Sequence, residues 1–163
     1  SPVRLEHNQV GQLLLTLLST YVRINDLGYV GYEKIMISLS RNDYEPDLCY
    51  FRKETAAQFK PRQMHFPAPD FIVEILSEST AAHDRGVKLV DYAAHGVGEY
   101  WIIDPTAEVV EQYLLRGDSY ELAVKVIDGP LGSAAVPGFH IPVRAIFDET
   151  ENVRALQTIL QAG

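Results

Sequence analysis

The sequence predicts an α/β or α+β fold in which a central mixed β-sheet is flanked by helices. Leucines recur at helical spacing near the N-terminus, several later runs are rich in β-branched and aromatic residues, and a second helical segment separates two of those runs. This order of helix, strands, helix and strands is typical of helices packed on a sheet. The chain of 163 residues has an ordinary globular composition, so we expect a single domain over residues 1–163.

The first half of the chain predicts one long helix and three strands. The helix spans roughly residues 8–25, with an apolar side formed by Leu13, Leu14, Leu17, Leu18, Tyr21 and Val22. The runs 29–39, 47–51 and 70–76 have the composition of strands. Residues 52–68 contain prolines and charged residues between these strands and are interpreted as a loop.

The second half predicts a helix, three more strands and a C-terminal helix. The helix spans about 82–95 and ends at Gly96, and the run 99–104 is a strand that Pro105 ends. The runs 108–115 and 120–127 flank "RGDS" and predict an extra β-hairpin towards the C-terminus. Residues 129–143 are interpreted as a loop with at most short strands, and 152–161 as a short amphipathic helix.

Composition excludes several classes of protein. A net charge of −8 argues against a protein that grips long nucleic acid by bulk electrostatics, because phosphate binding uses Lys and Arg. Cys49 is the only cysteine, which excludes an intramolecular disulfide and a cysteine-based zinc cluster and fits a reducing cytoplasm. The N-terminal stretch shows no signal-peptide pattern, and no apolar run reaches the ~18 residues of a membrane span. We therefore expect a cytoplasmic protein without a membrane partner.

One stretch departs from the acidic average. Lys53, Lys60 and Arg62 follow one another closely, and the aromatic side chains of Phe51 and Phe59 are interleaved with them. Such a stretch is either a solvated loop or a local patch that contacts phosphates in nucleic acid.

Glu74 raises a specific question. It lies in the predicted strand "DFIVEIL", where alternation places it on the same face as Ile72 and Leu76. An unpaired carboxylate on a dry face costs several kcal/mol, on the order of the penalty for a buried ion. Glu74 therefore pairs with a Lys or Arg, lies at a solvated strand end, or converges with Asp47 of the preceding strand on a divalent cation.

Four segments occur in a characteristic order: "EPDLCYF", "PAPDFIVEILSEST", "DRGVKLVDYAAHGVGEYWIIDP" and "VPGFHIPV". In this order the chain resembles the Uma-type restriction endonucleases, a branch of the PD-(D/E)XK nuclease superfamily. The resemblance covers about residues 7–143 and implies a restriction-endonuclease-like fold. It also implies a metal-dependent endonuclease that hydrolyses phosphodiester bonds in DNA.

The resemblance assigns roles to particular residues. Asp47, Glu74 and the backbone carbonyl of Ile75 would hold Mg²⁺ or Mn²⁺. The usual lysine position, two residues after the glutamate, is occupied by Leu76, and the matching lysine is Lys88 in the following helix. Asp47, Glu74 and Lys88 would then be the catalytic residues.

The alternative interpretation of Lys88 is an exposed lysine paired with Asp84 at the i,i+4 spacing. At about 100° per residue, Lys88 shares one face of the predicted helix with Asp84 and Tyr92. The opposite face is apolar and carries Leu89, Val90, Ala93 and Ala94.

Other residues are candidates for lining the site: His7, Asp70, Tyr92 and Gln112. DNA is the expected partner, with Lys53, Lys60 and Arg62 as candidate contacts. Superfamily likeness and the amphipathic C-terminal helix favour a homodimer. Because Leu76 replaces the usual lysine and the chain is acidic, the alternative function is a catalytically silent nucleic-acid-binding or dimeric interaction module of the same fold.

Overall fold

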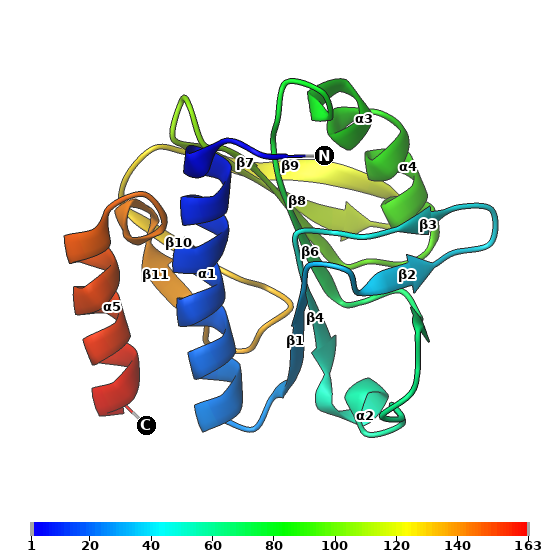
Figure 1. Cartoon of the computed structure of the whole chain (residues 1–163), viewed down its shortest axis with the longest axis horizontal. Coiled ribbons are helices and arrows are strands. Elements are labelled where there is room, and N and C mark those ends of the chain that lie inside the picture. The colour runs from blue at the N-terminus through cyan, green and yellow to red at the C-terminus, as the bar shows by residue number, and fades with distance from the viewer. Residues whose placement is uncertain (1, 163) are drawn as a thin grey trace.

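A computed structural model describes residues 2–162 and has a six-stranded mixed sheet at its centre (Figure 1). Within the sheet, β6 and β7 are parallel and every other neighbouring pair is antiparallel. The predicted mixed sheet flanked by helices is confirmed. In spatial order the strands are β1 (Gly28–Tyr32), β4 (Leu48–Arg52), β6 (Phe71–Ile75), β7 (Glu99–Asp104), β8 (Val109–Arg116) and β9 (Ser119–Val126).

One face of the sheet is covered by α1 (Leu5–Ile24), and α5 (Glu149–Ala162) packs beside α1 on the side away from the sheet, as Figure 1 shows. The leucine side of α1 is buried there, and Phe71 packs edge-to-face against Trp101 at 5.0 Å between ring centroids. Both helices are longer than predicted, because α1 begins before residue 8 and α5 before residue 152.

The opposite face carries a second core around Ile72, Tyr92 and Tyr100. It is covered by helices after β6 and by a separate three-stranded sheet. That small sheet has the order β3 (Asp43–Tyr44), β2 (Met36–Ser38) and β5 (His65–Phe66). The prediction of one strand over 29–39 is therefore wrong: the chain leaves β1 at Tyr32, turns through Lys34 in the left-handed region (φ 66°) and enters β2 in another sheet.

The predicted helix over 82–95 is broken in two. Gly86 has φ −107° and ψ −96°, outside the helical region, and separates α3 (Ala81–Arg85) from α4 (Val87–Ala94). A Cβ at this position would lie 2.9 Å from the carbonyl oxygen of Ala82, so the tight junction excludes a side chain. The break changes the direction in which α4 presents its side chains.

The remaining elements are short or form hairpins. The interpretation of 52–68 as a loop is wrong in part, because it contains α2 (Lys53–Ala56) as well as β5. The predicted hairpin is confirmed as β8 and β9, joined through Gly117 at φ 67°. Two short strands and a 3₁₀ turn follow: β10 (Pro130–Gly132), β11 (His140–Pro142) and η1 (Val143–Ile146). Every helix within residues 2–162 is too short or too polar to cross a membrane.

Candidate active site

Two acidic residues meet where β4 begins and β6 ends. The backbone N–H of Asp47 donates a hydrogen bond to Glu74 Oε1 at 3.1 Å, and the N–H of Ile75 donates one to Asp47 Oδ2 at 2.7 Å. The antiparallel pairing of Leu48 with Val73 makes this exchange possible, because it places Asp47 beside the end of β6. The two strands therefore hold both carboxylates at one point.

Lys88 of α4 reaches the same point. Its ammonium contacts Glu74 Oε2 and forms an ion pair with Asp84 Oδ1 at 2.9 Å. The Lys88 side chain is 15% exposed and that of Glu74 is 2% exposed, so this is a largely dry cluster. The Thr80 hydroxyl donates to Asp84 Oδ2 at 3.0 Å, which orients the second carboxylate. Lys88 thus bridges two buried acids from different elements.

His7 of α1 approaches the cluster from the other side. Its Nε2 lies 3.5 Å from Asp47 Oδ1. The hydrogen bond with Asp47 raises the pKa of His7 above its ordinary value, although burial opposes the shift, and the backbone of Ile75 adds to it. His7 therefore contacts the Asp47 carboxylate, just as Lys88 contacts that of Glu74.

These residues line a cavity of about 560 Å³. Its carboxylates outnumber its lysines, and this excess of negative charge favours a cation in the cavity. The five acids are Glu33, Glu45, Asp47, Glu74 and Asp84, and the two lysines are Lys34 and Lys88.

The pKa values of the paired Glu74 and Lys88 side chains are both shifted. Burial raises the pKa of Glu74 to about 8, the charge of Lys88 opposes this, and Asp47 and Asp84 add to it. Burial also tends to lower the pKa of Lys88, but its contacts with Glu74 and Asp84 outweigh burial and raise it. Lys88 is therefore the permanent cation of the cluster, and Glu74 is the group whose ionisation responds to an added positive charge.

The donor set fits a hard divalent cation in its chemistry. Two carboxylates and a backbone carbonyl are oxygen ligands of the kind that Mg²⁺ and Mn²⁺ prefer, and the cavity beside them leaves room for water. Over residues 2–162, no three His, Cys, Asp or Glu side chains are already gathered as a metal site. Asp47 and Glu74 are instead tied to backbone N–H groups, His7 and Lys88.

Tyr92 lies deeper, behind the acids. Its ring is fully buried and packs edge-on against Tyr44 and Tyr100, with 5.3 Å between centroids in both pairs. Its hydroxyl finds no hydrogen-bond partner among residues 2–162. Nearby Glu74 and Asp84 reinforce the effect of burial in raising its pKa, so Tyr92 stays neutral and serves as an apolar wall of the cluster.

The structure does not bring two of the other candidates to the cluster. Asp70 accepts a hydrogen bond from the backbone N–H of Arg52 at 2.8 Å, at the opposite end of β6 from Glu74. Gln112 pairs with Trp101 in the sheet and lies on the face opposite Glu74, where it donates to Glu99 at 2.7 Å. Strand alternation does not specify which strands adjoin or which face of the sheet holds the site. The sequence therefore could not exclude Asp70 and Gln112 from the cluster.

Glu99 is a buried acid of a different kind. It accepts hydrogen bonds from Trp101, Gln112 and Ser133 and from the backbone N–H groups of two residues in the loop after β10. Its lone pairs are fully engaged, so Glu99 fastens that loop to the sheet. Asp84, by contrast, lines the cavity, and its i,i+4 spacing to Lys88 was the signal that could have marked it as a site residue.

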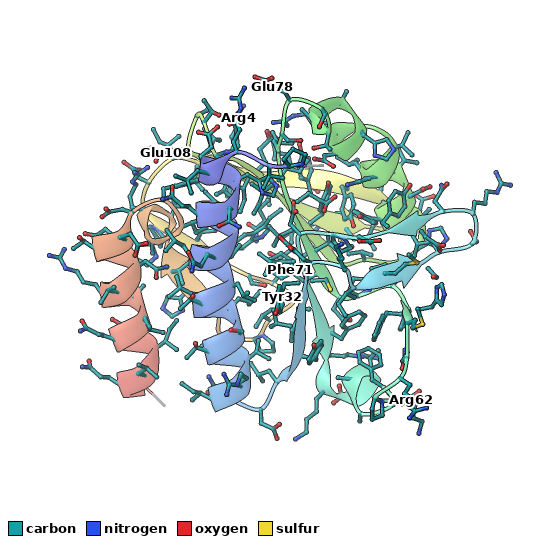
Figure 2. All side chains as sticks on the ribbon, in the orientation of Figure 1. Arg4, Tyr32, Arg62, Phe71, Glu78 and Glu108 are labelled. Atoms are coloured by element: carbon teal, nitrogen blue, oxygen red, sulfur yellow. The ribbon has the colours of Figure 1, made fainter. Side chains whose placement is uncertain are left out.

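The candidate DNA contacts lie away from the acids. Lys53 follows the far end of β4 and pairs with Asp26. Arg62 lies beside α2, at the end of the molecule opposite Arg4 and Glu78, as Figure 2 shows. Lys60 lines a separate cavity, bounded by residues of β1, of α2 and of the segment that leads to β5.

Comparison with known proteins agrees with this arrangement. Residues 1–144 match the family model described as "Uma2: Putative restriction endonuclease". The chain belongs to the Uma2 family. A comparison with curated proteins found no match.

This Uma2 member shares its fold with a solved structure. The crystal structure of "a putative nuclease belonging to DUF820" from Anabaena variabilis ATCC 29413 aligns with a TM-score of 0.75 at 16% identity, over 90% of this chain and 83% of the other. The type IIG restriction endonuclease BpuSI aligns with a TM-score of 0.47 at 15% identity, over 95% of this chain and 16% of the other. The first of these shows that the two chains share a fold.

Proposed function

We propose that this Uma2 protein is a metal-dependent endonuclease that hydrolyses phosphodiester bonds in DNA. One observation carries the proposal: Asp47, Glu74 and Lys88 converge from two adjacent strands and a helix on one acidic cavity. Two acids and a lysine at one point supply the ligands and the cation that phosphodiester hydrolysis needs.

Asp47, Glu74 and the carbonyl of Ile75 would hold Mg²⁺ or Mn²⁺. When bound, the ion activates a water and stabilises charge on the phosphate. Lys88 places an ammonium beside Glu74 and stabilises negative charge on the non-bridging oxygens of the scissile phosphate. Leu76, at the usual lysine position, lies in the apolar core and contributes no charge.

Asp84 is proposed as the positioning residue of Lys88. Its carboxylate is oriented by Thr80 and contacts the ammonium directly. With a cation held at Glu74, Asp84 would keep the Lys88 ammonium in the cavity through their ion pair. His7 plays the corresponding part for Asp47 from α1.

The proposed substrate contacts are Lys53, Lys60 and Arg62, on the surface around α2. A homodimer is proposed as well, because Val153 and Leu160 remain exposed on α5. The apparent mass of the protein in light scattering tests the dimer independently of nuclease activity.

Incubation with supercoiled plasmid and Mn²⁺ tests the enzymatic proposal. We expect nicked or linear product that EDTA prevents. Turnover should fall by about 10²-fold or more in Glu74→Ala, Asp47→Ala and Lys88→Ala, the loss typical of one electrostatic group. Lys125→Ala, on the exposed strand β9, is the matched control and should cut normally. Intact Mn²⁺ binding without cleavage of duplex, single-stranded or branched DNA would favour the catalytically silent module instead.

A double-mutant cycle tests the role of Asp84 without relying on cleavage. Calorimetry with Mn²⁺ should show weaker binding to Asp84→Asn, because Lys88 then depends on Glu74 alone and competes with the ion. In the Lys88→Ala background the same substitution should have a smaller effect. Equal effects in both backgrounds would show that Asp84 acts only as a nearby charge.

A further inference from the structure

A second cavity lies apart from the acids, between β1, α2 and the segment that leads to β5. Its volume is about 730 Å³, within the range of sites that take small organic groups. Three aromatic side chains and two lysines are among the residues that line it: Tyr29, Phe59, Phe66, Lys53 and Lys60. A cavity with this lining can hold a flat, apolar group that carries negative charge nearby.

The aromatic rings pack against one another in a cluster in which Tyr29 remains exposed to solvent. Phe59 packs edge-on against Phe66 at 5.1 Å and lies edge-on to Tyr29 at 6.5 Å between centroids. Phe59 also packs against the buried Phe51, which holds it in place. Tyr29 remains 46% exposed. Its ring is therefore available to stack on a ligand without displacing a neighbour.

The charges at this cavity are not all neutralised within the protein. Lys53 contacts Asp26, which also lines the cavity. Lys60 forms no ion pair with any residue in 2–162, and neither does Arg62, two positions further along the exposed loop. In a chain of net charge −8, this is a local site for an anion.

We propose that this cavity binds an unpaired nucleobase, which stacks on Tyr29 while Lys60 contacts an adjacent phosphate. The inference rests on the proposed nuclease function and specifies its substrate as DNA that contains unpaired nucleotides. Bases inside a duplex are stacked on one another and cannot enter such a cavity, whereas every unpaired base offers a face to an aromatic ring.

The spacing to the acids is compatible with one bound strand. Tyr29 pairs with Phe51, and Asp47 lies four residues before Phe51 on the same strand path. At ~3.3 Å per residue this separation is about 13 Å. It corresponds to about four stacked nucleotides at ~3.4 Å each. The unpaired base would therefore lie a few nucleotides from the scissile phosphate.

Binding in EDTA tests this proposal without any cleavage. Fluorescence anisotropy should be measured with a labelled single-stranded 20-mer and with the corresponding duplex. We expect Tyr29→Ala to weaken single-strand binding about 10-fold or more, the loss of one stacked base, and to leave duplex binding unchanged. Tyr29→Phe should retain single-strand affinity because it keeps the ring.

Matched controls isolate the cavity from general effects. Lys60→Ala should weaken single-strand binding, while Lys125→Ala and Leu122→Ala, on the exposed strand β9, should not. Single-strand affinity that is unchanged in Tyr29→Ala overturns the proposal, and so does an equal loss for single strand and duplex. Absence of single-strand binding by the wild type also overturns it. Cleavage of plasmid with Mn²⁺ is a separate measurement, so the nuclease function can stand when this inference fails.

Discussion

Glu74 shows how one residue can be buried and still remain chemically useful. Its carboxylate accepts a backbone N–H from Asp47 and contacts Lys88, so neither oxygen lacks a partner. Those contacts offset part of the cost of burial, but its pKa stays raised because the site is dry and two other acids are close. Removing the Lys88 ammonium would leave the ionised Glu74 without a compensating charge, whereas an added divalent cation would stabilise ionised Glu74.

The pH dependence of stability follows from this shift. In the metal-free protein, the pKa of the Glu74 carboxyl rises from its ordinary value of 4.5 in the unfolded chain to about 8 in the fold. The contribution of Glu74 to the unfolding free energy is therefore complete below pH 4.5 and is lost as the pH rises to 8. The raised pKa of His7 acts in the same direction above its ordinary value of 6.5. Glu74→Gln should therefore flatten the fall of the unfolding free energy between pH 5 and pH 8.

Urea denaturation in EDTA at several pH values measures this effect. His7→Gln is the companion variant, since it should remove only the part of the fall that lies above pH 6.5. An identical pH slope in wild type and Glu74→Gln would show that Glu74 is ionised in the fold throughout this range, as in a permanent ion pair with Lys88.

At the scale of single residues, alternation along the strand predicted that Glu74 faces the interior, and its partner Lys88 came from family resemblance. The alternative interpretation makes Lys88 an exposed lysine paired with Asp84, yet Lys88 is only 15% exposed, and Asp84 is buried and lines the cavity. Local spacing identified the contact between these two side chains but not their burial. Burial depends on how the helices pack against β6, which the sequence pattern does not specify.

Among the elements, the junction between α3 and α4 most affects the site. Periodicity predicted one continuous helix with Val90 on its apolar face, but Val90 is 65% exposed and Tyr92 is fully buried. A glycine inside a helix costs only ~1 kcal/mol, so Gly86 alone did not predict a break. The break turns Lys88 and Tyr92 towards the sheet and Val90 towards solvent.

Gly86→Ala should therefore destabilise the fold by about 1–3 kcal/mol, as overpacking does, because its Cβ would lie 2.9 Å from a backbone oxygen. Plasmid cleavage with Mn²⁺ should fall as well, since the junction positions Lys88 against Glu74. Chemical denaturation and the plasmid assay measure the two effects. Gly98→Ala is the control, because its Cβ would meet its nearest neighbour at an ordinary 3.6 Å. A Gly86→Ala protein as stable as the wild type would mean that the junction relaxes freely.

At the scale of the whole molecule, periodicity and composition were sufficient to predict a mixed sheet between helices. They were not sufficient to separate β1 from β2, because β-branched and aromatic residues lie on both sides of Glu33 and Lys34, where the chain changes sheets. The convergence of Asp47 with Glu74 was conditional on β4 adjoining β6, and the pairing of these strands satisfies that condition. Non-local pairing of this kind is the part of the fold that local patterns encode least.

The distribution of charge leads to a last prediction. With a net charge of −8, the proposed DNA binding would depend on a few cations rather than on the overall field of the protein. Lys60 and Arg62 are the cations near α2 that form no ion pair within residues 2–162, whereas Lys53 must first exchange its interaction with Asp26. Lys60→Ala with Arg62→Ala should therefore weaken duplex binding and make its salt dependence shallower, by about 0.9 in log–log slope for each phosphate that the variant no longer neutralises.

Anisotropy titrations in EDTA over a range of NaCl concentrations measure that slope. Lys53→Ala should change the slope less than the double variant does, because part of its charge already interacts with Asp26. Lys125→Ala removes one positive charge from β9, the edge strand at the other side of the sheet from β1, and should leave the slope unchanged. If Lys125→Ala and the double variant alter the slope equally per charge, binding follows net charge, and the surface around α2 has no special part in holding DNA.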